Sequence, residues 1–156
     1  MIGFALRFAI VAVAAFVFAE VSMAGQCPLT AQLVLRDLQS GIVGQTGTVW
    51  TIEPDCSFTV ARQIALQTGA PHRRGQLTPE QTAKLNELLA RIDPASFPAQ
   101  IGEPQVNGRE ISLAYGGVSS TLNLPPAGSG GGSAARDRHT TRLLDLAENL
   151  EQLVGD

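Results

Sequence analysis

The sequence lacks the features that mark several common classes of protein. Its 156 residues contain two cysteines and no C-x-x-C pair, which excludes a disulfide-dense mini-protein and gives no support to a thiol redox site. The longest apolar run has 12 residues, Phe8 to Ala19, whereas a membrane-spanning helix needs about 18 or more. The net charge of −3 shows no excess of basic residues of the kind that binds nucleic acid, so we expect no nucleic-acid partner.

Sequence patterns of the common hydrolases and nucleotide-binding proteins are also missing. No H-E-x-x-H, G-x-S-x-G or G-x-x-x-x-G-K-[ST] pattern occurs, and no carboxylates cluster at metal-ligand spacing. The two histidines, His72 and His139, lie in or beside polar segments that we predict to be flexible, whereas a catalytic base must be held rigidly. We therefore favour solvent-exposed histidines over catalytic ones. We therefore expect a protein that is not an enzyme and that holds no cofactor or metal.

The first 24 residues have the pattern of a secretory signal peptide. Arg7 is the only charged side chain before Glu20, the apolar run lies between them, and the small-x-small triplet Ser22, Met23, Ala24 follows. We predict a signal peptide over residues 1–24, cleaved after about Ala24; an uncleaved anchor is the alternative. The mature chain, residues 25–156, is then a single domain that is not embedded in a membrane and is periplasmic or secreted.

The two cysteines are predicted to form a disulfide after export. Strands over about residues 31 to 36 and 47 to 52 would form a hairpin in which facing residue numbers sum to about 85. Cys27 then falls near position 58, at the same end of the hairpin as Cys56, and an oxidising compartment favours their pairing. A bond that closes a loop of about 30 residues stabilises the fold by roughly 3 to 4 kcal/mol.

Hydrophobic periodicity predicts an α+β fold with the element order β-β-β-α-β-β-α. We expect an antiparallel sheet of about five strands, with two amphipathic helices on one face. Residues Gln67 to Gly75 read as a loop, and a flexible Gly-rich loop is predicted at 126–136. The other predicted strands cover residues 57–63, 111–115 and 118–124, and the predicted helices cover residues 78–92 and 140–153.

Two local signals fix details of this fold. Thr78, Pro79 and Gln81 can form a capping box at the start of the first helix. The dipeptide Gly116-Gly117 between two alternating runs indicates a two-residue hairpin turn that would place Tyr115 opposite Val118. The first helix and the last hairpin are therefore the most clearly specified elements.

Two groups of side chains allow more than one interpretation. Trp50 and Tyr115 either pack in the core or, on a half-exposed sheet, anchor a partner, and we favour the core. The basic cluster His72, Arg73, Arg74 either attracts an acidic partner or is a solvated loop, and we favour the loop.

The elements placed above resemble the emfourin family, small bacterial proteins that inhibit thermolysin-like metalloproteases. The similarity rests on the Leu-Thr-Pro-Glu helix start at Leu77 to Glu80, the connector with Phe97 and Pro98, the late hairpin and the Leu-rich closing helix. It spans about residues 31 to 154. The resemblance implies an α+β inhibitor with a thermolysin-like metalloprotease as its partner; the export signal, the cysteine pair and the Gly-rich loop are additions in this chain.

The leading hypothesis is therefore an exported, non-enzymatic binding protein, with metalloprotease inhibition as its specific form. We expect a monomer that blocks a cleft with its first turn, formed by Ser40, Gly41, Ile42, Val43 and Gly44. Ile42 and Val43 are either exposed at the tip or folded back under the sheet. The alternative function is a structural or accessory protein of the cell envelope.

Overall fold

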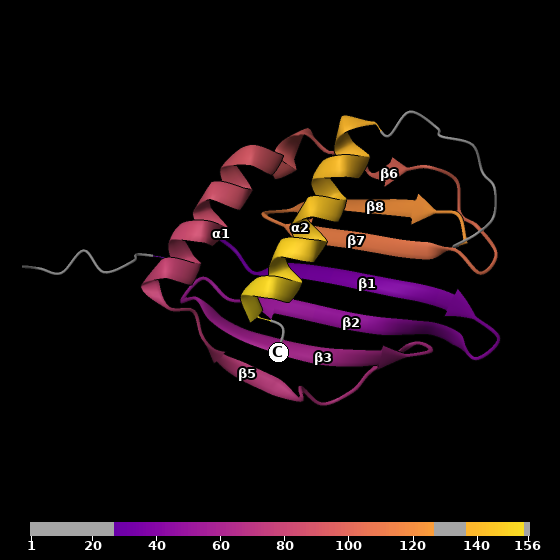
Figure 1. The fold of residues 1–156 in the computed structure, drawn as a ribbon, viewed down its shortest axis with the longest axis horizontal. Helices are drawn as coiled ribbons and strands as arrows, with labels where there is room; N and C mark the ends of the chain where they lie inside the picture. The colour runs from indigo at the N-terminus through magenta and orange to yellow at the C-terminus, as the bar shows by residue number, and fades with distance from the viewer. Residues whose placement is uncertain (1–26, 127–136, 155–156) are drawn as a thin grey trace, which may run out of the picture.

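A computed structural model describes residues 27–126 and 137–154, which form one sheet with both helices on the same face (Figure 1). The predicted signal peptide, 1–24, and all of the predicted Gly-rich loop except Pro126 lie outside the described residues. The elements in chain order are β1 (Leu33–Gly41), β2 (Gly44–Ile52), β3 (Ser57–Ile64), β4 (Gln67–Thr68), β5 (Arg73–Gln76), α1 (Pro79–Ile92), the 3-10 turn η1 (Pro94–Ser96), β6 (Gln100–Ile101), β7 (Arg109–Tyr115), β8 (Val118–Leu124) and α2 (Arg138–Val154).

The α+β class is confirmed, but the prediction of about five antiparallel strands is wrong. The sheet has eight strands in the order β4-β3-β2-β1-β7-β8-β6, with β5 also paired to β3. It is mixed, because β6 runs parallel to β8. The predicted loop Gln67 to Gly75 is corrected as well, since it contains β4 and most of β5.

The three strands that the sequence did not reveal are short and lie at the edges of the sheet. β4 and β5 cover the outer edge of β3, and β6 covers the outer edge of β8. Strands of two to four residues cannot show a hydrophobic alternation, and they are held by backbone hydrogen bonds such as that from the N–H of Thr121 to the carbonyl of Ala99, 2.9 Å. They shield edges that would otherwise pair with other chains.

The predicted registers of both long hairpins are confirmed. Leu33 lies opposite Ile52 in the β1–β2 pair, as the expected sum of 85 requires. Tyr115 lies opposite Val118 in the β7–β8 pair, and Gly116 and Gly117 both have positive φ in the turn between them. The turn and the side-chain alternation therefore specify the same register. This register places the same face of these strands against the helices.

The two helices lie antiparallel to each other on the sheet. The capping box predicted for α1 is present: the Thr78 hydroxyl accepts from the N–H of Gln81, and the Gln81 side chain accepts from the N–H of Thr78. The Gln81 side chain also donates to the carbonyl of Leu153 near the end of α2, 2.6 Å away. Asp93, in the left-handed conformation, ends α1 directly before Pro94.

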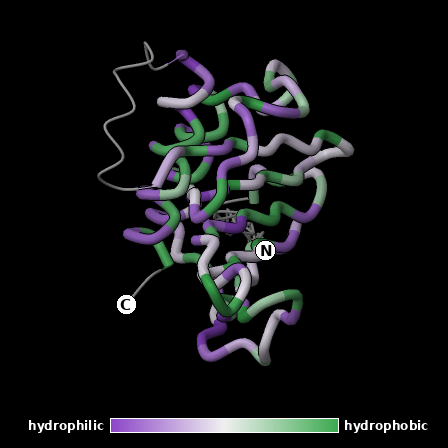
Figure 2. Tube along the Cα trace, turned by 90° about the vertical axis from the view of Figure 1, so that its right-hand side faces the viewer, coloured by the Kyte–Doolittle hydropathy of each residue, from purple (hydrophilic) through white to green (hydrophobic). Residues whose placement is uncertain are grey.

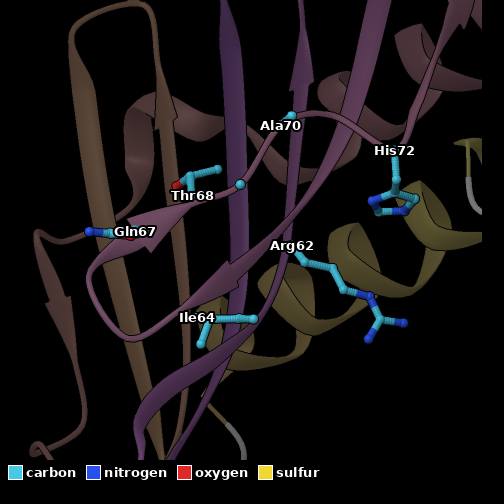
Figure 3. Close-up of a pocket in the computed structure, with 7 residues that line it drawn as sticks. Arg62, Ile64, Gln67, Thr68, Ala70 and His72 are labelled. Carbon is cyan, nitrogen blue, oxygen red and sulfur yellow. The ribbon is translucent and has the colours of Figure 1, made fainter.

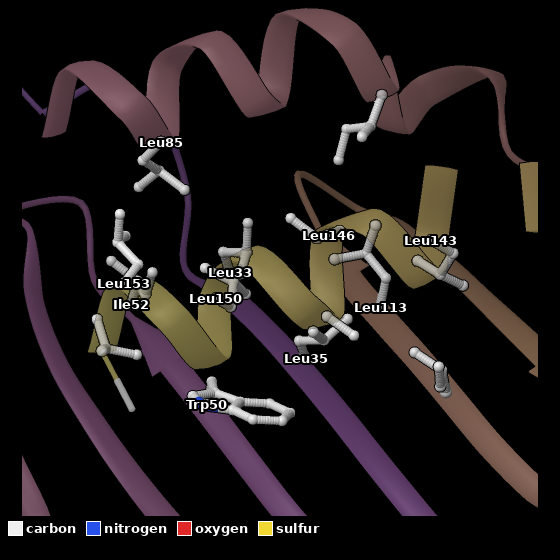
Figure 4. Close-up of a cluster of buried hydrophobic side chains, with 14 of the residues drawn as sticks. Leu33, Leu35, Trp50, Ile52, Leu85, Leu113, Leu143, Leu146, Leu150 and Leu153 are labelled. Atoms are coloured by element: carbon white, nitrogen blue, oxygen red, sulfur yellow. The ribbon is translucent and has the colours of Figure 1, made fainter. Parts of the chain in front are cut away.

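The core lies between the sheet and the helices (Figure 4). Leu33 and Leu35 of β1 are completely buried, and they face the leucines that α2 presents at helical spacing. Full burial of one such side chain stabilises the fold by roughly 1.5 to 3 kcal/mol. Trp50 is 4% exposed in the same cluster, so the core interpretation of this residue is confirmed. The α2 side chains in the cluster are Leu143, Leu146, Ala147, Leu150, Leu153 and Val154.

The predicted disulfide between Cys27 and Cys56 is present in the structure. It links the segment before β1 to the turn between β2 and β3, with the two Cα atoms 5.5 Å apart. Cys56 is buried in the core cluster, and Cys27 packs against that cluster. The bond therefore closes the end of the sheet opposite the β1–β2 turn.

Candidate partner-binding surface

Three connections come together at one end of the sheet, which we call the loop end: the turn 42–43 between β1 and β2, the turn 65–66 between β3 and β4, and the loop 102–108 before β7. In Figure 1 this end lies on the right, away from the start of α1. Figure 2 turns it toward the viewer and shows hydrophobic stretches on protruding turns. The large apolar side chains that are exposed within the described residues all lie here: Ile42, Val43, Ile64, Leu66 and Val106.

The first turn projects its apolar side chains into solvent. Ile42 is fully exposed and Val43 is 70% exposed, so the alternative in which they fold back under the sheet is wrong. Gly41 and Gly44 flank the turn as the last Cα pair of the hairpin, and Gly44 supplies the positive φ, +93°. Of the predicted binding residues, only Ile42 and Val43 offer large apolar side chains; Ser40 and the two glycines position them.

Hydrogen bonds join the end of β1 to the loop 102–108, and the turn 65–66 lies close to Gly44. The carbonyl of Gly108 accepts a hydrogen bond from the N–H of Ser40, 2.9 Å, and the side chain of Gln39 donates to the carbonyl of Asn107, 2.7 Å. On the other side, a Cβ at Gly44 would lie 3.3 Å from the Cα of Ala65. The apolar tips are therefore presented by turns held in place before any partner binds.

The helices leave part of their face of the sheet uncovered beside the loop end, and this part has a polar floor. Asp37 of β1 and Arg109 of β7 form a bidentate ion pair, with Nε of Arg109 2.8 Å from a carboxylate oxygen. The hydrogen bond to Asp37 raises the pKa of Arg109, and burial opposes this effect. Thr46, Thr48 and Glu151 line the same cavity of about 290 Å³.

Trp50 lies at the inner limit of this cavity. Its indole Nε1 is buried and has no hydrogen-bond acceptor among the described residues. Since the ring itself is almost wholly buried, Trp50 belongs to the core and does not anchor a partner at the surface.

The histidines and Tyr115 occupy different environments. His72 is exposed, as expected. The expectation of a solvent-exposed His139 needs correction, because its ring packs edge-on against Phe97, with ring centroids 5.5 Å apart, and its Nδ1 is buried. Tyr115 packs against the core, as favoured, and its hydroxyl lies 3.4 Å from the N–H of Thr30.

In the described part of the chain, no group of three or more His, Cys, Asp or Glu side chains could hold a metal ion. In the same residues no helix is long and apolar enough to cross a bilayer.

Three residues of the loop end were not predicted. Ile64 continues the alternation of Phe58 and Val60 along β3, so it could have been recognised as the last residue of that strand. Leu66 lies two residues later, in a turn where its side chain is exposed and gains nothing from burial. Val106 lies in an irregular loop that carries no periodic signal, and only the fold brings it near the first turn.

Comparison with known proteins gives no family assignment. No protein-family model matches the chain, and no curated protein matches it in sequence. The resemblance to the emfourin family therefore stays a prediction.

Proposed function

We propose that the protein is an exported, non-enzymatic binding protein that contacts a protein partner with its loop end. The observation that carries this proposal is the gathering of all the exposed large apolar side chains of the described residues at one end of the sheet. Folding alone gains nothing from such a patch, and exposed apolar patches typically mark interaction sites. Loops held by a rigid scaffold are the usual place for such sites.

The specific form of the proposal is inhibition of a thermolysin-like metalloprotease by the first turn. The resemblance to emfourin suggests this partner, and the turn with Ile42 and Val43 is narrow enough, at two residues between paired strands, to enter a cleft. Because the turn is fixed by its neighbours, little conformational entropy is lost on binding, which is a requirement for high affinity from a small contact. The disulfide supports a protein that works outside the cytoplasm.

The test is an inhibition assay on a panel of thermolysin-like proteases with the exported protein. We expect inhibition at micromolar concentration or below, and its loss in the double variant Ile42→Asp/Val43→Asp. A matched control, Ala83→Asp/Ala114→Asp, adds the same charges at exposed positions outside the loop end and is expected to inhibit like the wild type. If the wild-type protein leaves hydrolysis by every protease unchanged, the inhibitor proposal is wrong.

The second candidate function is a structural or accessory protein of the cell envelope, for which the disulfide-stabilised sheet is also suitable. A pull-down from the envelope fraction with the wild type and the Ile42→Asp/Val43→Asp variant separates the two. A metalloprotease recovered only by the wild type supports the inhibitor. Other envelope components, recovered equally by both proteins, support the accessory role.

A further inference from the structure

A groove runs along the outer edge of β3, next to the loop end. It has a volume of about 550 Å³ and lies between the second half of β3 and the segment 67–72 that returns beside it (Figure 3). Two backbone hydrogen bonds hold this segment: the N–H of Gly69 donates to the carbonyl of Arg62, 2.8 Å, and the N–H of His72 donates to the carbonyl of Val60, 3.0 Å. The groove is therefore part of the sheet edge, and its volume is within the range of specific binding sites.

The lining of the groove combines basic and apolar side chains. Figure 3 shows the guanidinium of Arg62 and the imidazole of His72 extending in the same direction, with Ile64 and Ala70 at other points of the lining. No acidic side chain lines the groove. Ile64 is one of the exposed apolar side chains of the loop end, so the groove and the loop end form a continuous surface.

The charge of Arg62 is not matched within the described residues. No ion pair or side-chain hydrogen bond of Arg62 or His72 is present there. The residue opposite Arg62 on β2 is Thr48, which is uncharged. Asp37, an acid on β1 beyond Thr48, is already engaged by Arg109. A groove whose described lining carries basic side chains and no acidic ones is complementary to an acidic ligand.

We propose that this groove binds an extended acidic segment of the protein partner. A carboxylate of that segment would pair with the guanidinium of Arg62, accepting two parallel hydrogen bonds, while the ring N–H of His72 donates to the same group. An adjacent apolar side chain of the segment would pack on Ile64. This inference rests on the proposed function, because it names the chemistry of the partner that contacts the loop end.

The same residues could meet an anionic lipid surface, but the shape of the site favours a peptide. A lipid surface is contacted by protruding residues, whereas Arg62 and His72 line a concave groove beside a paired strand. Binding to vesicles is therefore an outcome that would overturn the proposal.

The experiment is an NMR titration of the 15N-labelled exported protein with two probe peptides, acetyl-Glu-Leu-Glu-Leu-amide and its Gln-for-Glu counterpart. We expect the acidic peptide to shift the amide signals of the groove segment and of β3, and to bind about tenfold or more tightly than the neutral peptide, as hydrogen bonds to charged groups require. Arg62→Gln should reduce the affinity of the acidic peptide to that of the neutral one. Arg36→Gln, at an exposed arginine on the opposite face of the sheet, should leave it unchanged.

Three results would overturn the proposal: equal binding of the two peptides, signal shifts confined to other surfaces, or Arg62-dependent binding to phosphatidylglycerol vesicles without binding of the acidic peptide. The variant Ile42→Asp/Val43→Asp separates this inference from the proposed function. The tip variant should still bind the acidic peptide, because neither substitution lies in the groove. If Arg62→Gln binds the protein partner normally while the tip variant does not, the groove proposal fails and the proposed function stands.

Discussion

Gly47 of β2 lies directly opposite Leu38 of β1, and a side chain at Gly47 has no space. A Cβ atom there would overlap the carbonyl oxygen of Asp37 and come within 2.9 Å of the Cα of Leu38. Leu33 and Leu35 face the helices, and strand alternation places Leu38 on the opposite face of the sheet. Leu38 is nevertheless buried. The two strands can approach this closely only because Gly47 has no side chain. Glycine has the same role where curved sheets bend.

Gly47→Ala is therefore expected to destabilise the fold. The new methyl group must displace the β1 backbone, and overpacking of this kind typically lowers the free energy of unfolding by about 1 to 3 kcal/mol. Urea denaturation followed by Trp50 fluorescence measures the change. Gly41→Ala is the control, because the nearest atom to its new Cβ would be 3.9 Å away and its free energy of unfolding should stay within about 0.5 kcal/mol of the wild type. Equal stability of both variants would contradict the argument.

The parts of the fold that the sequence predicted are those with a local physical cause. The capping box at Thr78, the turn at Gly116 and Gly117 and the α2 leucines each depend on residues close together in the chain. The short edge strands do not, because their hydrogen bonds join backbone groups of segments that carry no pattern. Of the loop end, the sequence indicated only the first turn, Ser40 to Gly44, and it left open whether Ile42 and Val43 are exposed. Val106 and Leu66 could not be added, because their nearness to that turn is produced by the sheet topology.

Removal of the α1 cap should cost a modest amount of stability. Thr78→Ala leaves the N–H of Gln81 without its side-chain acceptor, and the loss of such a cap lowers the free energy of unfolding by about 1 kcal/mol. Thr78→Ser retains the hydroxyl acceptor and should unfold close to the wild-type urea concentration. A loss of stability as large for serine as for alanine would show that the Thr78 methyl group, and not the cap, stabilises this end.

The carboxyl of Asp55 is expected to titrate below its ordinary pKa of 3.8. Hydrogen bonds from the side chain and then the backbone N–H of Ser57 lower the pKa of Asp55. Because the folded pKa is the lower one, the stabilisation from these bonds is complete above the unfolded pKa and is lost as the pH falls through the folded pKa. NMR titration of the Asp55 carboxyl carbon measures the pKa, and Ser57→Ala should move it upward. An unchanged pKa in that variant would rule out the side-chain hydrogen bond.

Substitution of the exposed tip should leave stability unchanged. Ile42→Ser/Val43→Ser removes side chains that are not buried, and such surface changes usually stay within about 0.5 kcal/mol. Leu33→Ala, in the centre of the core, should instead lower the free energy of unfolding by about 2 to 5 kcal/mol. Urea denaturation of both variants makes the comparison. If Ile42→Ser/Val43→Ser lowered the free energy of unfolding as much as Leu33→Ala, these two side chains would be stabilising the fold. Their exposure would then give no support to a binding role.

The disulfide is expected to supply a large share of the stability. Cys27 and Cys56 are 29 residues apart, and loss of the cross-link in Cys27→Ala/Cys56→Ala releases unfolded-chain entropy worth about 3 to 4 kcal/mol. Urea denaturation measures the loss, and alkylation of the denatured, unreduced protein followed by mass spectrometry counts free thiols. The wild type should take up no alkyl group before reduction and two afterwards. Two labelled cysteines before reduction would show that the bond is absent from the protein, and the double variant would then unfold close to the wild-type urea concentration.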